Sequence, residues 1–143
     1  MSKDINFSGV SIYQGKSLIL TDVTFNIAHG EFVYLIGKTG TGKSSLLKTI
    51  YGDLPLRAGN AQVAGFDLEK MNWKTVPYLR RKLGIIFQDF QLLMDRSVDD
   101  NLEFVLRATG TNDKSLIKLK SDEALKRVGL QSKGFKMPHE LSG

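Results

Sequence analysis

The chain has 143 residues, with 20 basic and 15 acidic side chains, and its formal net charge is therefore +5. A hydrophobic content of 41% and a charged content of 24% are average globular values, which excludes a disordered or fibrous protein. The lack of cysteine excludes disulfides, thiol catalysis and cysteine-ligated zinc, and it suits a reducing compartment. The most apolar short run, residues 32–36, is far too short to span a membrane.

The first part of the chain has the pattern of short strands. Residues 10–13 end at a Gln14-Gly15 turn signal, and residues 23–27 alternate between apolar and polar side chains. Residues 32–36 are continuously apolar, which predicts a strand buried on both faces of a mostly parallel sheet. A glycine-rich loop follows, and residues 44–51 then predict a helix that Gly52 caps.

The second half of the chain is mainly helical in pattern. Residues 61–68 predict a strand or hairpin, residues 77–81 a short helix with proline in its first turn, and residues 83–87 a second apolar strand. Helices are predicted at 98–108 and 115–128. In the second of these Ile117, Ala124, Leu125 and Val128 share one face, and Gly129 ends it. The fold class is therefore α/β with a β-rich appendage and a helical subdomain.

Residues 37–44 (GKTGTGKS) match the phosphate-binding pattern G-x-x-x-x-G-K-[ST] at every fixed position. Glycines let successive backbone N–H groups face inward, and the following helix directs its positive end at the same place. Lys43 can then reach the β- and γ-phosphates of ATP, and the Ser44 hydroxyl can ligate Mg²⁺. The alternative, a glycine-rich turn with an exposed lysine, would match by chance about once in a few hundred such chains. The residues expected to contact nucleotide are Gly37, Thr39, Gly40, Thr41, Gly42, Lys43, Ser44 and Ser45.

Three further segments stand in the order found in ATP-binding cassette (ABC) domains: residues 10–13, Phe87-Gln88-Asp89, and the terminal Leu141-Ser142-Gly143. The chain resembles that family along essentially its whole length. Residues 83–93, with support from 37–40 and 135–139, resemble its cell-division branch, the FtsE type, in its Bacteroidetes form. The ATP-binding subunits of lipoprotein-releasing and macrolide exporters are similar to that branch.

The resemblance implies roles for four more residues. Tyr13 corresponds to the aromatic residue that stacks on adenine, although a half-exposed strand tyrosine is the plainer interpretation of its position alone. Gln88 corresponds to the Q-loop glutamine, which helps to complete the Mg²⁺ shell. Ser142 and Gly143 correspond to the start of the signature motif, which contacts the γ-phosphate held by a second copy, and this implies a homodimer of the full-length domain.

An apolar cluster follows Gln88 and consists of Phe90, Leu92, Leu93 and Met94. Such a cluster is either ordinary core or, as the resemblance suggests, part of the cleft where a membrane partner docks a coupling helix. For the cell-division branch this partner is an FtsX-like transmembrane subunit, and the ATPase lies in the cytoplasm on the inner face of the plasma membrane.

Basic residues cluster at two places in the sequence. The lysines of residues 114–127 are interrupted by Asp122 and Glu123, which favours a solvated helix face over a nucleic-acid site. Arg80-Arg81-Lys82 suits either an anionic membrane surface or solubility. His29 and His139 have no ligand spacing, so side chains alone predict no metal site.

In ABC domains the Walker B strand, the catalytic glutamate and the switch histidine all follow the signature motif. We therefore interpret the chain as the N-terminal part of one such domain, with its β-rich and phosphate-loop part at about 1–90 and its Q-loop and helical subdomain at about 88–143. No catalytic residue is assigned, because the general base would lie after Gly143. This chain is expected to bind nucleotide weakly at best and not to hydrolyse it. A non-catalytic interaction module remains an alternative, while a P-loop small-molecule kinase is disfavoured by Gln88 and the terminal Leu-Ser-Gly.

Overall fold

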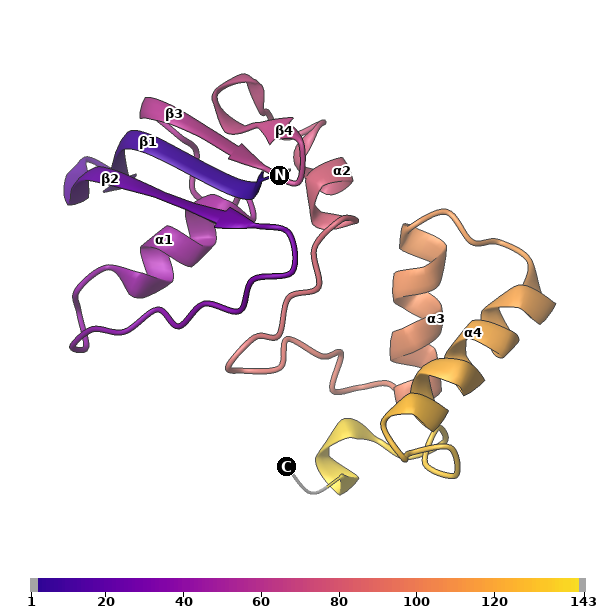
Figure 1. The fold of residues 1–143 in the computed structure, drawn as a ribbon. Helices are drawn as coiled ribbons and strands as arrows, with labels where there is room; N and C mark the ends of the chain where they lie inside the picture. The colour runs from indigo at the N-terminus through magenta and orange to yellow at the C-terminus, as the bar shows by residue number, and fades with distance from the viewer. Residues whose placement is uncertain (1–2, 142–143) are drawn as a thin grey trace. The chain divides into compact units, whose positions relative to one another are not determined.

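A long β-hairpin organises the first half of the chain in the computed structural model, which describes residues 3–141 (Figure 1). Strand β1 (Lys3–Gln14) pairs antiparallel with β2 (Ser17–Ala28), and Gly15 turns the chain between them with a φ of 62°. β1 also pairs antiparallel with β3 (Ala58–Val63), which forms a second hairpin with β4 (Phe66–Asp67). The sheet order is β2-β1-β3-β4. The predicted strands and turn of residues 5–27 and the hairpin at 61–68 are confirmed.

Helix α1 (Lys43–Ile50) covers one face of this sheet, and the core of the first half lies between them (Figure 1). Leu46 of α1 packs into a cluster with Phe7, Val10 and Ile12 of β1 and with residues of β3. The ring of Phe7 stacks on that of Phe25, with centroids 5.0 Å apart. Burial of these apolar side chains is the main force that holds α1 on the sheet.

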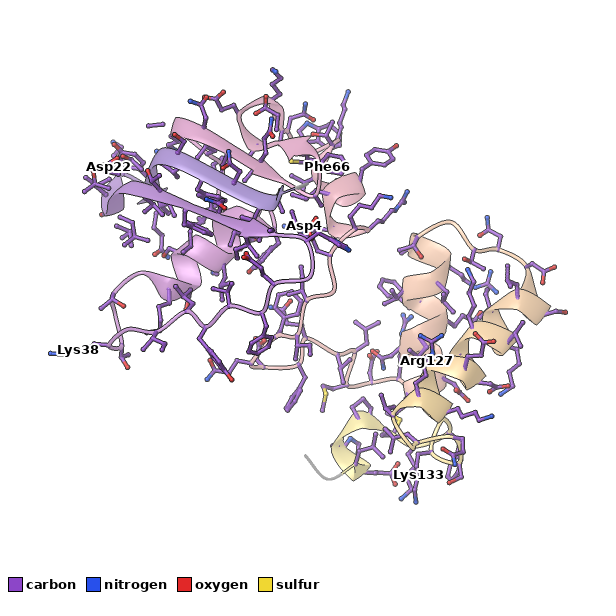
Figure 2. The ribbon with its side chains drawn as sticks, in the orientation of Figure 1. Asp4, Asp22, Lys38, Phe66, Arg127 and Lys133 are labelled. Carbon is purple, nitrogen blue, oxygen red and sulfur yellow. The ribbon has the colours of Figure 1, made fainter. Side chains whose placement is uncertain are left out.

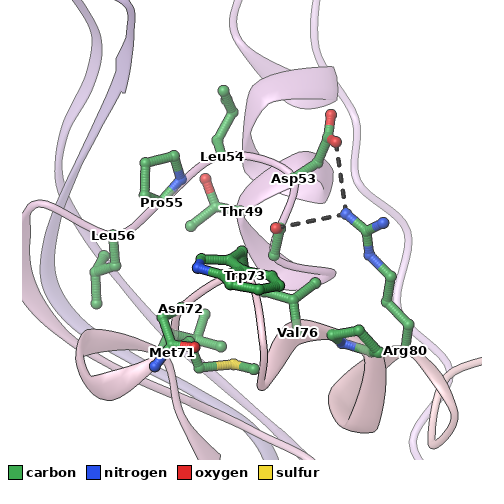
Figure 3. Close-up of a pocket in the computed structure, with 13 residues that line it drawn as sticks. Thr49, Asp53, Leu54, Pro55, Leu56, Met71, Asn72, Trp73, Val76 and Arg80 are labelled. Atoms are coloured by element: carbon green, nitrogen blue, oxygen red, sulfur yellow. Dashed lines mark hydrogen bonds and ion pairs between the residues drawn. The ribbon is translucent and has the colours of Figure 1, made fainter.

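The end of α1 is fixed by a glycine cap and by an arginine from a neighbouring helix. Gly52 has a φ of 73°, and the Asp53 N–H donates to the Lys48 carbonyl at 2.7 Å, so the predicted glycine cap is confirmed. Arg80, from α2 (Val76–Arg80), donates to the Tyr51 carbonyl at 3.1 Å and pairs with Asp53 at 3.5 Å (Figure 3). A short 3₁₀ turn, η1 (Leu68–Lys70), precedes α2. The predicted short helix with proline in its first turn is therefore confirmed.

Two predicted strands are wrong in the described structure. Residues 32–36 follow β2 without forming a strand, and all five side chains are exposed, by between 46% and 88%. Residues 83–87 likewise form no strand, and Ile86 is 97% exposed. The apolar pattern predicts burial on two faces of a parallel sheet, but the described residues supply no parallel neighbour for either segment. Without a neighbouring strand, an apolar segment has neither ladder hydrogen bonds nor a packing surface.

The chain divides into two compact units, Met1–Ile85 and Ile86–Gly143. The second contains α3 (Val98–Ala108), α4 (Lys114–Arg127) and the 3₁₀ turn η2 (Pro138–Glu140). Helix α3 begins with a reciprocal capping box between Ser97 and Asp100, and Asp113 caps α4. None of the helices among residues 3–141 is long and apolar enough to cross a membrane.

The buried face of α4 differs from the predicted one. Ile117 and Leu125 are buried, as predicted, and Gly129 ends the helix with a φ of 72°. Ala124 and Val128 are exposed, while Ser121 takes the third buried position of the face. Residues 117, 121 and 125 follow one another at intervals of about one helical turn, so they lie on one face of α4. This is the face that meets α3.

Candidate functional site

The glycine-rich loop of residues 37–44 leads directly into α1. Gly40 and Gly42 adopt φ values of 83° and 91°, in the left-handed region that glycine tolerates best. The Thr41 hydroxyl donates to the Lys38 carbonyl at 2.8 Å, and the Thr41 N–H donates to the same oxygen at 3.3 Å. These bonds curl the loop back on itself before the helix begins.

Gly42 is required at its position for a second reason, which is contact with β2. A Cβ atom there would lie 2.9 Å from Leu20 Cγ and 3.0 Å from Ile19 Cγ2. A Cβ atom at Gly37 would lie 2.9 Å from the Thr41 hydroxyl oxygen. The fixed glycines of the motif therefore let the loop fold tightly and let the start of α1 approach the sheet.

The amino end of α1 is open, whereas those of α3 and α4 are closed by side-chain caps. Gly42 is the N-cap of α1 and provides no side-chain hydrogen bond, and the first turn contains no acidic residue. At α3 and α4, by contrast, the side chains of Ser97, Asp100 and Asp113 satisfy backbone N–H groups. The first N–H groups of α1 and its positive dipole end are therefore available to an anion, and α1 is the helix that begins in the phosphate-type loop.

Lys43 places its ammonium group on the same loop. Its Nζ donates to the carbonyl oxygens of Gly37 at 2.6 Å and Lys38 at 2.7 Å. Ser44 is exposed beside it, while Ser45 is buried and accepts, through its carbonyl, a hydrogen bond from the Thr49 hydroxyl at 2.9 Å. The loop thus combines the Lys43 cation, backbone N–H donors and the exposed Ser44 hydroxyl, and this donor set fits the phosphates of a nucleotide with Mg²⁺.

Tyr13 lies at the end of β1, near the point where the loop meets β2. The register pairs Tyr13 with Leu18 and Ile12 with Leu20, and Leu20 is the residue against which Gly42 packs. Tyr13 is half-buried, and the Arg57 guanidinium lies 5.9 Å from its ring centroid. Arg57 also donates to the Gly15 carbonyl at 2.7 Å. Sequence reasoning missed Arg57, because it lies far from Tyr13 along the chain and no local pattern marks such a pair.

The other predicted site residues lie in the second unit or beyond the described chain. Gln88 is exposed in the segment that precedes α3. Ser142 and Gly143 lie outside the described residues, so the structure gives no account of them. Within residues 3–141 no three carboxylate or histidine side chains gather where they could hold a metal ion, so the only predicted metal ligands remain Ser44 and Gln88, together with nucleotide phosphates.

The segment after Gln88 is held by Asn101 of α3. The Asn101 side chain accepts from the Leu93 N–H at 2.8 Å and donates to the Leu93 carbonyl at 3.0 Å. Phe90 and Gln91 adopt φ values of 58° and 47°, which only a few per cent of non-glycine residues do. The segment is thereby fixed in an irregular shape at the start of α3.

The apolar cluster after Gln88 borders a groove of about 580 Å³ in the second unit. Phe90, Leu92 and Met94 are exposed and line it, while Leu93 is half-buried and does not. Within the described residues, these side chains therefore do not form a closed core. The other lining residues are almost all apolar and come from α3, α4 and the last described residues: Val98, Leu102, Ala124, Leu125, Val128, Leu130, Pro138, His139 and Leu141.

Comparison with known proteins gives a consistent family. The profile described as "ABC transporter" matches residues 20–143. The chain is 41% identical over 140 residues to the cell division ATP-binding protein FtsE of Escherichia coli K12, covering 97% of this chain and 63% of that protein. It is 37% identical over 134 residues to FtsE of Streptococcus pneumoniae D39, covering 94% and 58%, and 37% identical over 124 residues to FtsE of Mycobacterium tuberculosis, covering 87% and 54%. The chain spans about three fifths of the length of these relatives.

Two solved structures share the fold. One is the ATP-binding cassette MJ0796 as a dimer in a post-hydrolysis state bound to ADP and phosphate, with a TM-score of 0.82, 27% identity and coverage of 96% of this chain and 63% of that one. The other is cbiO1 of Clostridium perfringens, part of the ABC transporter complex cbiONQ, with a TM-score of 0.82, 27% identity and coverage of 99% and 57%. The family profile, the relatives and the fold agree with the motif order along the chain. The chain belongs to the ABC transporter family and is an FtsE-like ATP-binding member of it.

Proposed function

We propose that residues 37–44 and the amino end of α1 bind the phosphates of ATP together with Mg²⁺. The observation that carries this proposal is the open amino end of α1, with the Lys43 ammonium 2.6 Å from the Gly37 carbonyl. The backbone N–H groups and Lys43 would bind the β- and γ-phosphates, and the Ser44 hydroxyl would ligate Mg²⁺. Negative phosphate oxygens are better acceptors for the ammonium than two neutral carbonyls, so Lys43 would leave the carbonyls when nucleotide binds.

Three further roles follow from family membership and remain proposals. Tyr13 would stack on adenine, and Gln88 would complete the Mg²⁺ shell. Ser142 and Gly143 would contact the γ-phosphate held by a second copy. The dimeric state of MJ0796 with ADP and phosphate supports a homodimer of the full-length protein.

We infer that the full-length protein hydrolyses ATP and couples this reaction to an FtsX-like transmembrane subunit in cell division, from the inner face of the plasma membrane. The FtsE relatives support this role. Lys43, Ser44 and the loop amides would stabilise charge on the transferring phosphoryl group, which is the main protein contribution to such catalysis. The 143-residue chain would bind ATP without turnover, because the family places its general base after the signature motif.

We propose that the groove lined by Phe90, Leu92 and Met94 receives an apolar helix face of the FtsX-like subunit. The groove lining contains one ionisable side chain, His139, so it suits an apolar occupant. Leu92→Asp would then abolish capture of the FtsX-type subunit in detergent. Leu119→Asp is the matched control, because Leu119 is also exposed on the second unit but does not line the groove. Equal capture by wild type and Leu92→Asp would contradict this docking site.

The test of nucleotide binding is calorimetric titration of the chain with ATP and Mg²⁺. Lys43→Ala should weaken binding at least about tenfold, since it removes a charge-assisted contact of about 1.5–3 kcal/mol. Lys38→Ala removes the same charge from an exposed position in the same loop and should change binding little. Equal losses in both variants would mean that loop charge alone, rather than the Lys43 contact, determines binding. Phosphate release by the wild-type chain that Lys43→Ala abolishes would contradict the absence of turnover.

A second candidate is the ATP-binding subunit of a transporter. The fold of cbiO1, which belongs to a transporter complex, matches as well as that of MJ0796. Selective capture of an exporter permease in place of an FtsX-type subunit would favour this alternative.

A further inference from the structure

An aromatic and basic surface lies on and before α2, away from the phosphate loop in sequence. Residues 70–82 contain five basic side chains and no acidic one. Two large aromatic side chains in the same segment are exposed, Trp73 by 80% and Tyr78 by 57%. We call Trp73, Lys74, Tyr78, Arg81 and Lys82 the α2 patch.

The α2 patch lies on and beside a firmly held helix: Tyr78 belongs to α2, Trp73 and Lys74 precede it, and Arg81 and Lys82 follow it. Leu79 is fully buried beneath it, and Val76 is half-buried. Arg80 fastens the helix to the end of α1 through the Tyr51 carbonyl and Asp53, as Figure 3 shows for the Asp53 pair. Tyr78 and the C-cap residue Arg81 are three residues apart, so they share a face that differs from that of Leu79, and Lys82 is exposed in the turn that follows. The fold, rather than a loose segment, therefore determines the exposure of the two rings.

Each exposed ring of the α2 patch has a cation beside it. The Lys74 ammonium lies 5.2 Å from the Trp73 ring centroid, and the Arg81 guanidinium lies 5.3 Å from that of Tyr78. The nearest acidic side chains in sequence are Asp67, whose carboxylate pairs with Lys70 at 2.8 Å, and Glu69. The five residues of the patch include three cations and no anion, with two aromatic rings among them. Figure 2 draws the described side chains on the ribbon, including those along α2.

We propose that the α2 patch binds the anionic headgroup layer of a lipid bilayer directly. Tryptophan and tyrosine prefer the membrane–water interface, where an apolar ring meets hydrated polar groups. Lysine and arginine beside them place their charges among lipid phosphates, while their methylene stems cover apolar surface. The complementary charge is the reason to prefer anionic lipid over a neutral surface.

The ring contacts favour lipid over nucleic acid as the occupant. Proteins that bind single strands stack bases on open aromatic faces. In the α2 patch a cation already lies over a face of each ring. Headgroup phosphates need no open face, because they bind the cations themselves. The inference goes beyond the proposed function, since it requires neither nucleotide nor a protein partner.

The test uses Trp73, which is the only tryptophan of the chain, as its own reporter. Adding phosphatidylglycerol vesicles to the 143-residue chain should shift Trp73 fluorescence to the blue and carry the chain into the vesicle fraction. Phosphatidylcholine vesicles should do neither. Lys74→Gln/Arg81→Gln/Lys82→Gln should lower the partition coefficient about a hundredfold, at about fivefold for each basic residue.

The control variant is Lys16→Gln/Lys114→Gln/Lys133→Gln, which removes three exposed charges from scattered positions. An equal loss in this variant would overturn the proposal, because net charge would then explain binding. An unshifted Trp73 spectrum, or tighter binding of a single-stranded oligonucleotide that the patch variant alone loses, would also overturn it. ATP binding by the patch variant checks its fold. Vesicle binding without ATP binding in the wild-type chain would contradict only the proposed function.

Discussion

The Lys43 ammonium lies 2.6 Å from the carbonyl oxygen of Gly37, six residues earlier in the chain, and 2.7 Å from that of Lys38. The Lys43 side chain thus reaches back across the glycine-rich loop to the first residues of that loop. This contact keeps the cation over the open amino end of α1, where its charge adds to the helix dipole. An arriving phosphate would find the cation already in place, and it would have to displace only two neutral acceptors.

Gly42→Ala should destabilise the chain by about 2–4 kcal/mol, because it combines a strained φ with a close contact to Leu20. Gly40→Ala is the matched control, since Gly40 has a similar φ of 83° but no atom within 4 Å of the position that a Cβ would occupy. It should lose only the strain, about 1–2 kcal/mol. Urea unfolding measures both variants. Equal losses would show that the packing of Gly42 on β2 contributes nothing.

Asn101→Ala should loosen the segment that carries Phe90 and Leu92. Its side chain binds both backbone groups of Leu93, and replacing it would leave those groups unsatisfied, at about 1–3 kcal/mol. Hydrogen exchange of the Leu93 amide should accelerate by at least about fivefold. Asn112→Ala, at an exposed position before α4, should leave this amide unchanged. An unchanged Leu93 amide in Asn101→Ala would contradict the anchoring role.

Much of the fold, and of the backbone shape of residues 37–44, could be predicted from the sequence, since both depend on local signals. The turns at Gly15 and Gly52 and the glycines of the phosphate loop all have a backbone conformation that the residue type dictates. The anchoring of the Leu93 segment and the contact of Arg57 with Tyr13 could not be predicted, because both depend on which distant elements meet.

The wrong strand predictions have a related cause. Apolar runs at 32–36 and 83–87 indicate that these residues avoid water, but a strand exists only when another strand pairs with it. The family is predicted correctly even so, because the motif residues and their order determine it without the sheet. Periodicity places Ala124 and Val128 on the buried face of α4, whereas the structure gives the third buried position to Ser121.

The exposed segment 32–36 should make the isolated chain self-associate. Phe32, Tyr34 and Ile36 are exposed by 76% or more, and an apolar, proline-free segment without a paired strand is a template for β-association. Light scattering after size exclusion should show a mass that rises with concentration. Tyr34→Lys should reduce this rise, whereas Tyr78→Lys, at an exposed tyrosine on α2, should not. A monomeric wild-type chain at every concentration would contradict the prediction.

Asp67 should make stability depend on pH at low pH. The Lys70 ammonium at 2.8 Å and the Glu69 N–H at 3.1 Å hold the pKa of the Asp67 carboxyl below its usual value of 3.8. A carboxyl with a lowered folded-state pKa stabilises the fold above its unfolded-state pKa, and this contribution is lost as the pH falls through the folded-state pKa. The stability difference between wild type and Asp67→Asn should therefore shrink below pH 3.8. Carbon-detected titration of the carboxyl checks the direction, and a raised pKa would contradict the contacts.

The central claim is that the loop of residues 37–44 and the amino end of α1 receive the phosphates of ATP. The most direct measurement is the amide spectrum of the ¹⁵N-labelled chain, recorded as ATP and Mg²⁺ are added. We predict that the amides of Gly40, Gly42, Lys43 and Ser44 shift most, that Lys43→Ala weakens these shifts, and that amides of α4 stay in place. Saturable shifts confined to α4 or to the groove beside Leu92, with the loop amides unmoved, would contradict this claim.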